Sequence, residues 1–204
     1  MAVLDIRVLG DPILRERTPV LREVTDATRA LIADMFETMY AAEGIGLAAP
    51  QVGRTERVCV VDVDGTPVAL INPEIVSREG NERGEEGCLS IPEIFGDVDR
   101  SEHIVVRALD EHGEPIELEA HELMARCILH ELDHLDGKLF IDYMSLLKRK
   151  FTTRKWEGEV SKYPGFIRKL DPDAPKKRRS RDRTSGANAS DAGGAVEPPF
   201  EPEL

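Results

Sequence analysis

Apolar residues recur along this chain with two different spacings, and these spacings predict its secondary structure. Residues 26–43 carry apolar side chains at helical intervals, so they are expected to form an amphipathic helix. A second helix is expected from about residue 120 to Gly137, a residue type common just past a helix C-terminus. A third helical stretch begins around residue 143. The chain is therefore expected to have an N-terminal, a central and a C-terminal helix.

The segments between the first two helices are mostly short apolar runs separated by turn residues. Residues 57–63 and 67–72 flank an Asp-Gly dipeptide, which is typical of a tight hairpin turn. Residues 74–79 are expected to form another short strand, and residues 103–109 and 115–119 a second hairpin. No segment long enough for a crossover helix separates these strands, so we expect them to pair antiparallel.

Length and composition indicate one globular domain with an appendage. Residues 1–170 fit a single domain, because domains commonly contain about 100 to 200 residues. Residues 171–204 are poor in apolar groups and are predicted to be a disordered charged tail. No apolar run approaches a membrane span of roughly 18 residues, and the N-terminus lacks a targeting pattern. These features predict a cytoplasmic protein without membrane association, and we expect a monomer.

Charge is unevenly distributed along the chain. Residues 1–147 contain 13 basic and 30 acidic residues, a net charge of −17. Residues 148–183 contain 14 basic and 5 acidic residues, a net charge of +9. An acidic domain with a basic extension suggests a partner with a phosphate backbone, bound by the extension and not by the domain. A solvated helix and tail that only improve solubility are the alternative.

The central helix carries the sequence His-Glu-Leu-Asp-His at residues 130–134. His130 and His134 are four residues apart and so share one helix face, with Glu131 beside them to transfer protons. The apolar residues of the same segment give the helix a buried side, which argues against two solvated surface histidines. We therefore expect an α+β fold in which antiparallel strands pack around a central metal-binding helix that carries this HExxH motif.

Two histidines rarely hold a catalytic metal alone, because such sites commonly have three protein ligands and one open position. Cys88 is the candidate for the third ligand. It lies in a glycine-rich segment, residues 84–92, that reads as an exposed loop, whereas Cys59 lies inside an apolar run and is expected in the core. Three scattered cysteines are too few for a disulfide framework. A merely structural Cys88 is the alternative.

Three motifs together resemble those of the peptide deformylase family. They are Gly-Ile-Gly-Leu-Ala-Ala-Pro-Gln at residues 44–51, Glu-Gly-Cys-Leu-Ser at 86–90 and His-Glu-Leu-Asp-His at 130–134. The resemblance covers about residues 3–150. The family removes the formyl group from the N-terminal methionine of nascent bacterial polypeptides and releases formate. The resemblance implies this metal-dependent hydrolysis for the present chain, with N-formylmethionyl peptides as substrates.

The resemblance also assigns roles to individual residues. The metal ligands that it implies are Cys88, His130 and His134. Glu131 is implied to act as the acid and base, while the side-chain amide of Gln51 and the backbone N–H of Leu89 stabilise the oxyanion. Family members typically contain Fe²⁺ and also work with Ni²⁺, Co²⁺ or, less well, Zn²⁺, so Fe²⁺ is expected although the donor set by itself favours zinc. From the residues alone, we expect Glu86 to pair with an arginine such as Arg100 and to be structural.

An apolar pocket for the flexible methionine side chain is expected beside the metal. By resemblance, the residues that line it are Gly44, Ile45, Gly46, Leu123, Arg126 and Cys127. Two positions depart from the family pattern. Phe95 stands where bacterial members often have an arginine that contacts the substrate backbone, and Arg126 stands where an aliphatic residue is common. The side-chain preference beyond methionine is therefore left open.

Two other functions are compatible with parts of the sequence. A zinc metallopeptidase also uses HExxH, with a downstream acidic ligand such as Glu157, although Phe140 occupies the position of a metzincin's third histidine. A non-catalytic module that binds the ribosome or RNA through its basic segment is the second alternative. The presence of both Glu131 and Gln51 argues against a pure binding module. In the enzyme, a basic C-terminal helix would still bring an acidic domain to the ribosome surface.

Overall fold

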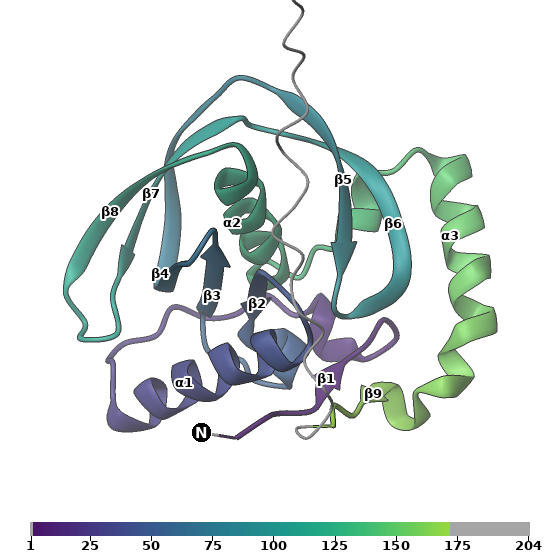
Figure 1. Ribbon diagram of the computed structural model, residues 1–204, viewed down its shortest axis with the longest axis horizontal. Helices are drawn as coiled ribbons and strands as arrows, with labels where there is room; N and C mark the ends of the chain where they lie inside the picture. Colours follow the sequence, from purple (N-terminus) through teal and green to yellow (C-terminus); the bar gives the residue numbers. More distant parts are fainter. Residues whose placement is uncertain (1, 172–204) are drawn as a thin grey trace, which may run out of the picture. The chain divides into compact units, whose positions relative to one another are not determined.

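The computed structural model describes residues 2–171, all within one compact unit, and shows an α+β architecture with antiparallel sheets (Figure 1). The helices are α1 (Asp26–Ala41), α2 (Glu122–Leu135) and α3 (Leu146–Glu159). The strands are β1 (Ile6–Arg7), β2 (Gly46–Ala48), β3 (Val58–Val63), β4 (Thr66–Glu79), β5 (Glu82–Cys88), β6 (Ile91–Arg100), β7 (His103–Leu109), β8 (Pro115–His121) and β9 (Ile167–Arg168). The three predicted helices are confirmed. Of the predicted tail, residues 171–204, all but the first residue lie outside the described residues.

The largest sheet has five strands in the order β2-β3-β4-β7-β8, and every neighbouring pair is antiparallel. Both predicted hairpins, β3–β4 and β7–β8, are confirmed. Residues 74–79 are not a separate strand, because they continue β4 beyond two register shifts in its pairing with β7. Such irregularities bend a strand without ending it. The alternation of apolar residues cannot distinguish a bent strand from two short ones.

Residues 84–92 are not the predicted loop, since β5 and β6 pair along most of their length as a separate two-stranded sheet. Glycine-rich and acidic, β5 has little intrinsic strand preference. Pairing with β6, which buries Ile91, Ile94 and Val98, supplies the ladder that local propensity does not. This hairpin is the element that brings Cys88 to α2.

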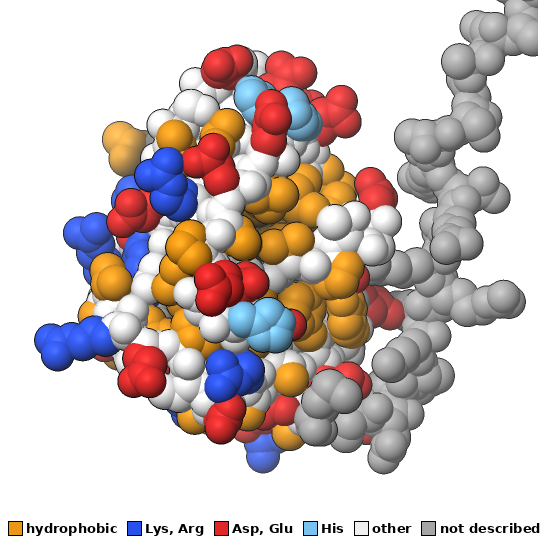
Figure 2. All heavy atoms as spheres, turned by 90° about the vertical axis from the view of Figure 1, so that its left-hand side faces the viewer, with side chains coloured by type: hydrophobic (Ala, Val, Ile, Leu, Met, Phe, Trp, Pro, Cys, Tyr) orange, Lys and Arg blue, Asp and Glu red, His pale blue; other side chains and the backbone are white. Residues whose placement is uncertain are grey.

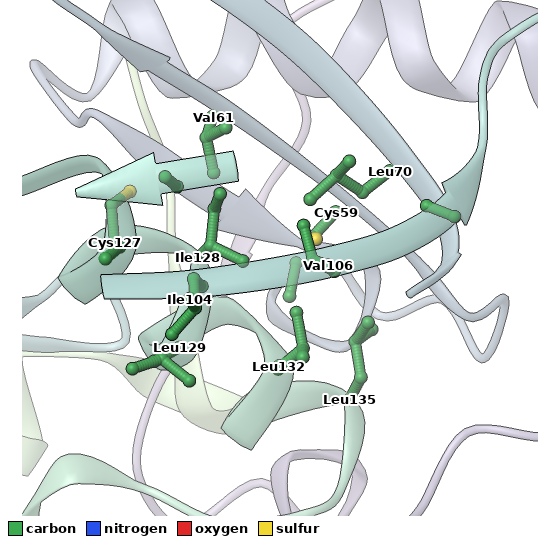
Figure 3. Close-up of a cluster of buried hydrophobic side chains, with 14 of the residues drawn as sticks. Cys59, Val61, Leu70, Ile104, Val106, Cys127, Ile128, Leu129, Leu132 and Leu135 are labelled. Atoms are coloured by element: carbon green, nitrogen blue, oxygen red, sulfur yellow. The ribbon is translucent and has the colours of Figure 1, made fainter. Parts of the chain in front are cut away.

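Helix α2 packs one face against the five-stranded sheet. Its Ile128, Leu132 and Leu135 are buried among sheet residues such as Val61 and Val106 (Figure 3). This spacing of three, four and seven residues produces the apolar stripe of an amphipathic helix. The packing fixes the rotation of α2 about its axis, and therefore the direction in which its histidines point.

The other two helices cover different parts of the fold. Leu31, Met35 and Met39 of α1 are buried in a second cluster that includes strand β3. Helix α3 is mostly exposed and is anchored by buried Trp156, whose Nε1 donates to the Leu9 carbonyl oxygen at 2.9 Å. Within the described residues, no helix combines the length and apolarity that a membrane span requires. Of the three helices, α2 is therefore the one that packs in the core cluster of the five-stranded sheet shown in Figure 3.

Candidate active site

Cys88, His130 and His134 converge in the folded chain. One donor atom from each lies within 4.8 Å of the others, and Cys88 Sγ is 3.2 Å from His134 Nε2. The histidines are buried one turn apart on α2, with ring centroids 5.0 Å apart, while Cys88 closes strand β5. A thiolate and two neutral imidazoles are a donor set that binds Zn²⁺ or Fe²⁺, so the residues present fit a divalent metal.

Glu86 is a buried carboxylate that connects His130 to Arg100 and Arg126. Its Oε2 lies 2.9 Å from His130 Nδ1, Arg100 donates to both of its oxygens at 2.8 and 2.9 Å, and Arg126 Nη1 lies 3.1 Å from Oε1. Burial by itself raises the pKa of Glu86, but hydrogen bonds from Arg100 and His130 outweigh it and lower the pKa to about 2. The charged carboxylate accepts from Nδ1–H and leaves Nε2 of His130 for a metal.

The expected pairing of Glu86 with Arg100 is confirmed, and it extends further than predicted. Arg100 Nη1 also donates to Asp133 Oδ2 at 2.5 Å, and Asp133 lies between the two histidines in the sequence. Arg126 donates to the Val98 and Glu82 carbonyl oxygens at 2.9 and 2.8 Å. Its guanidinium group therefore joins α2 to the β5–β6 hairpin. Arg126 is far from Glu82 and Val98 in the sequence, so no sequence pattern indicated this contact.

We predict that Glu86→Gln weakens metal binding by about 10- to 100-fold, as loss of a ligand's hydrogen-bond partner commonly does. In this variant, the part of the pH dependence of folding stability that comes from Glu86 should also be lost. Because the folded pKa is lowered from 4.5 to about 2, the stability that ionised Glu86 contributes is present above about pH 4.5 and is lost as the pH falls towards 2. Thermal unfolding at several pH values and metal content after dialysis measure both effects. Glu85→Gln, at the exposed neighbouring position, is the control, and an equal effect there would contradict the role of Glu86.

Glu131 lies beside the cluster in a buried position. Its Oε2 forms no hydrogen bond within the described residues. Gly46 makes room for it, since a Cβ atom there would lie 2.3 Å from Glu131 Oε1 and 2.7 Å from Cys127 Sγ. Burial raises the pKa of Glu131 to about 7; the electrostatic interaction with His130 opposes this shift, and the interaction with the Glu86 carboxylate adds to it. A carboxyl group with such a pKa can both accept and donate a proton near neutral pH.

Gln51 is held by the turn that follows β2. Its Oε1 accepts from the Ala48 backbone N–H at 2.7 Å, which fixes the orientation of the amide. Its Nε2 then points towards Ser90 Oγ at 3.3 Å and Cys88 Sγ at 3.6 Å. An N–H donor is thus directed towards Cys88 of the cluster. Ser90, which sequence reasoning did not select, was detectable only as part of the same motif as Cys88.

Gln51, Glu86, Cys88, His130 and Glu131 line a cleft of about 500 Å³, whereas His134 and Ser90 are not on its lining. Of the predicted site residues, those on its lining are Gly44, Ile45, Gly46, Gln51, Cys88, Leu89, Leu123, Arg126, Cys127, His130 and Glu131. Phe95 and Leu123 are 61% and 50% exposed, so they form part of its rim. Arg168 of β9 also lines the cleft and donates to the Leu89 carbonyl oxygen at 3.3 Å. Arg168 lies far from the three motifs in the sequence, so sequence reasoning did not select it.

A Cys-His-His cluster beside a carboxyl group of raised pKa is the arrangement of a metallohydrolase. The family model described as "Polypeptide deformylase" matches residues 3–150. The chain belongs to this family of enzymes, and the resemblance found in its three motifs is confirmed. The peptidase alternative finds no support, because Glu157 is exposed on α3 and lies in no metal-ligand cluster of the described residues.

Individual relatives agree with this assignment. A peptide deformylase of Alkalilimnicola ehrlichii is 57% identical over 164 residues, which cover 78% of this chain and 92% of the relative. One from Xylella fastidiosa (strain M12) is 54% identical over 165 residues, covering 78% and 97%. Among solved structures, the peptide deformylase of Legionella pneumophila matches with a TM-score of 0.76 and 42% identity over 78% of this chain and 96% of that one. That of Ehrlichia chaffeensis in complex with actinonin has a TM-score of 0.76, 38% identity and coverages of 78% and 98%.

Proposed function

We propose that this chain hydrolyses the N-formyl group from the N-terminal methionine of nascent polypeptides, with residues 1–170 as the catalytic domain. The observation that carries the proposal is the convergence of Cys88, His130 and His134, of which Cys88 and His130 line one cleft together with Glu131. Release of formate from formyl-Met-Ala-Ser tests it. Absence of formate release by the metal-loaded chain would refute the proposed activity.

Cys88, His130 and His134 would hold one divalent metal ion. When bound, such an ion lowers the pKa of a water molecule and polarises the formyl oxygen. The donor set accommodates Zn²⁺, Ni²⁺ and Co²⁺, and by family resemblance we expect Fe²⁺ in the cell. Elemental analysis after anaerobic purification tests the choice of ion. Fully active protein that contains zinc alone would contradict the expectation of iron.

The side chains of the cleft would carry out the proton transfers. Glu131, as a carboxylate, takes a proton from the attacking water molecule and then delivers it to the departing amine. The formyl C–N bond breaks, and the products are formate and a free methionyl N-terminus. The Gln51 amide and the Leu89 backbone N–H donate hydrogen bonds to the formyl oxygen as negative charge develops on it. Ile45, Leu123 and Cys127 would provide apolar contacts for the methionine side chain.

We predict that Gln51→Ala lowers kcat by about 10² to 10³, the effect of losing one oxyanion donor. The metal content should stay at the wild-type level, because Gln51 is not a ligand. Ser90→Ala is the matched control, since it removes the contact with Nε2 but keeps the amide, which Ala48 still orients. Formate release and elemental analysis measure both quantities. Equal losses of kcat in the two variants would show that packing, not the amide, is responsible.

We further propose that the basic segment, residues 148–183, attracts the ribosome surface and offsets the −17 charge of residues 1–147. Lys150 and Arg154 are exposed on α3, whereas Lys155 donates to the Glu93 carbonyl oxygen at 2.9 Å. A variant that ends at Leu170 and neutralises Lys150 and Arg154 should keep its activity on a free formyl-peptide and lose co-sedimentation with ribosomes. Binding of the full chain should weaken steeply with salt. Co-sedimentation that is the same at low and high salt would contradict this prediction.

A further inference from the structure

A second group of metal-ligand side chains lies on strands β7 and β8, outside the cleft. His103 and His121 face each other across these strands, with parallel rings whose centroids are 4.3 Å apart. Glu119 precedes His121 by two residues and so projects from the same face of β8. One donor atom from each of the three lies within 4.8 Å of the others. Figure 2 shows histidine side chains gathered among acidic ones near the top of the view.

His103 is oriented in a way that suits a ligand. Its Nδ1 lies 3.5 Å from Glu79 Oε2, and Glu79 pairs with it across strands β4 and β7. A carboxylate behind an imidazole is the usual means by which proteins orient a metal-binding histidine. Nε2 of His103 is buried and forms no hydrogen bond within the described residues, although Glu119 Oε1 lies 2.8 Å away. The Glu119 carboxylate is therefore close to Nε2 without satisfying it by a hydrogen bond, and a metal ion held by both groups would provide the missing partner.

We propose that His103, Glu119 and His121 form a second metal site that binds Zn²⁺, with Glu79 orienting His103. Two imidazoles and a carboxylate favour a borderline ion over Mg²⁺ or Ca²⁺, which prefer oxygen donors alone. Glu119 and His121 are 63% and 61% exposed, which leaves a coordination position open to water. His121 caps the N-terminus of α2 nine residues before His130, about 13 Å away along the helix axis. The two sites are therefore distinct.

An ion in this position would join β7 and β8 to the start of the helix that carries His130 and His134. The N-terminus of a helix repels a cation, but Glu79, Glu119 and the first-turn residue Glu122 provide opposite charge. No atom of the cluster lines the cleft. Occupancy should thus raise thermal stability and leave the rate of formate release unchanged. Selective binding to the folded state is what produces that stabilisation.

The test uses the full chain, with its active site first loaded with nickel and checked for full activity. After equilibrium dialysis against micromolar ZnCl₂, elemental analysis counts nickel and zinc per chain. The wild type should bind one equivalent of zinc while keeping its nickel. His121→Ala should weaken zinc binding at least about tenfold, since loss of an orienting partner alone costs that much. His112→Ala is the matched control, because His112 is the remaining histidine outside both clusters and is 71% exposed.

Glu119→Gln is a second variant, which keeps the size of the side chain but removes the charged carboxylate that would bind the ion. It should weaken zinc binding to a similar degree, and formate release should match the wild type in all three variants. Absence of zinc in the nickel-loaded wild type would overturn the proposal. Unchanged zinc affinity in His121→Ala and Glu119→Gln, or an equal loss in His112→Ala, would overturn it as well. Since formate release is measured separately, failure of this site remains distinguishable from failure of the proposed activity.

Discussion

Glu131→Gln is expected to lower kcat for formate release by about 10² to 10⁴, the usual contribution of a general acid and base. The amide has nearly the shape of the carboxyl group, so packing around this buried side chain is kept while proton transfer is lost. The metal content should remain at the wild-type level, because Glu131 is not among the converging donor atoms. Glu131→Ala should show the same loss of kcat. Elemental analysis and a formate assay on formyl-Met-Ala-Ser measure both quantities.

Substantial activity in Glu131→Gln would mean that another group transfers the proton. Glu86 is another carboxylate in the cleft that could be considered as the base. Its pKa of about 2 and its contacts with Arg100 and His130 make it a poor base. Loss of metal together with loss of activity would instead assign Glu131 to the binding of the ion. The two measurements therefore separate proton transfer from metal retention.

Cys88→Ala is expected to reduce the metal content far below one ion per chain. Its thiolate is the only anionic donor among the three converging residues, and the remaining imidazoles provide neither its charge nor a third ligand. We expect an affinity loss beyond the 10- to 100-fold that accompanies loss of a residue hydrogen-bonded to a ligand. Metal per chain after dialysis against a weak chelator, followed by formate release, checks the prediction.

Cys127→Ala is the matched control for Cys88→Ala. Cys127 is a buried cysteine of the same cleft, and its Sγ lies 3.4 Å from the Ile45 carbonyl oxygen. It belongs to no metal-ligand cluster of the described residues, so its replacement should leave the metal in place. A Cys88→Ala variant that keeps its metal would favour a different third ligand, as in an HExxH peptidase. The metal content of Cys88→Asp should lie between those of Cys88→Ala and Cys127→Ala, since a carboxylate can replace the thiolate as an anionic donor.

The motifs allowed much of the site to be predicted, because each motif places its residues by local geometry. Histidines four residues apart share a face of any α-helix, so His130 and His134 were recognisable before the fold was known. The amphipathic pattern of residues 26–43 likewise specified α1 without reference to its partners. Gln51 and Leu89 were identified only through resemblance to a family, since nothing in their own spacing indicates a hydrogen bond to an oxyanion.

Other features depend on pairing between distant segments. Residues 84–92 read as a loop because glycine and glutamate have little strand preference, yet the ladder with β6 makes them a strand. Arg126 and Phe95 depart from the family pattern, and both line the cleft. In the structure the Arg126 guanidinium binds the β5–β6 hairpin, while Phe95 lies exposed at the rim of the cleft.

By itself, the sequence determined the helices, the two hairpins of the main sheet and the residues of the three motifs, since these depend on contacts within a few positions. The tertiary structure decided that Cys88 Sγ lies 3.2 Å from His134 Nε2 and that Glu86 reaches His130 Nδ1. It also decided that His103 stacks on His121. Each of these distances depends on strand register and on the rotation of α2 in the core. Those are set by the burial of many apolar side chains at once, and no local pattern in the sequence records them.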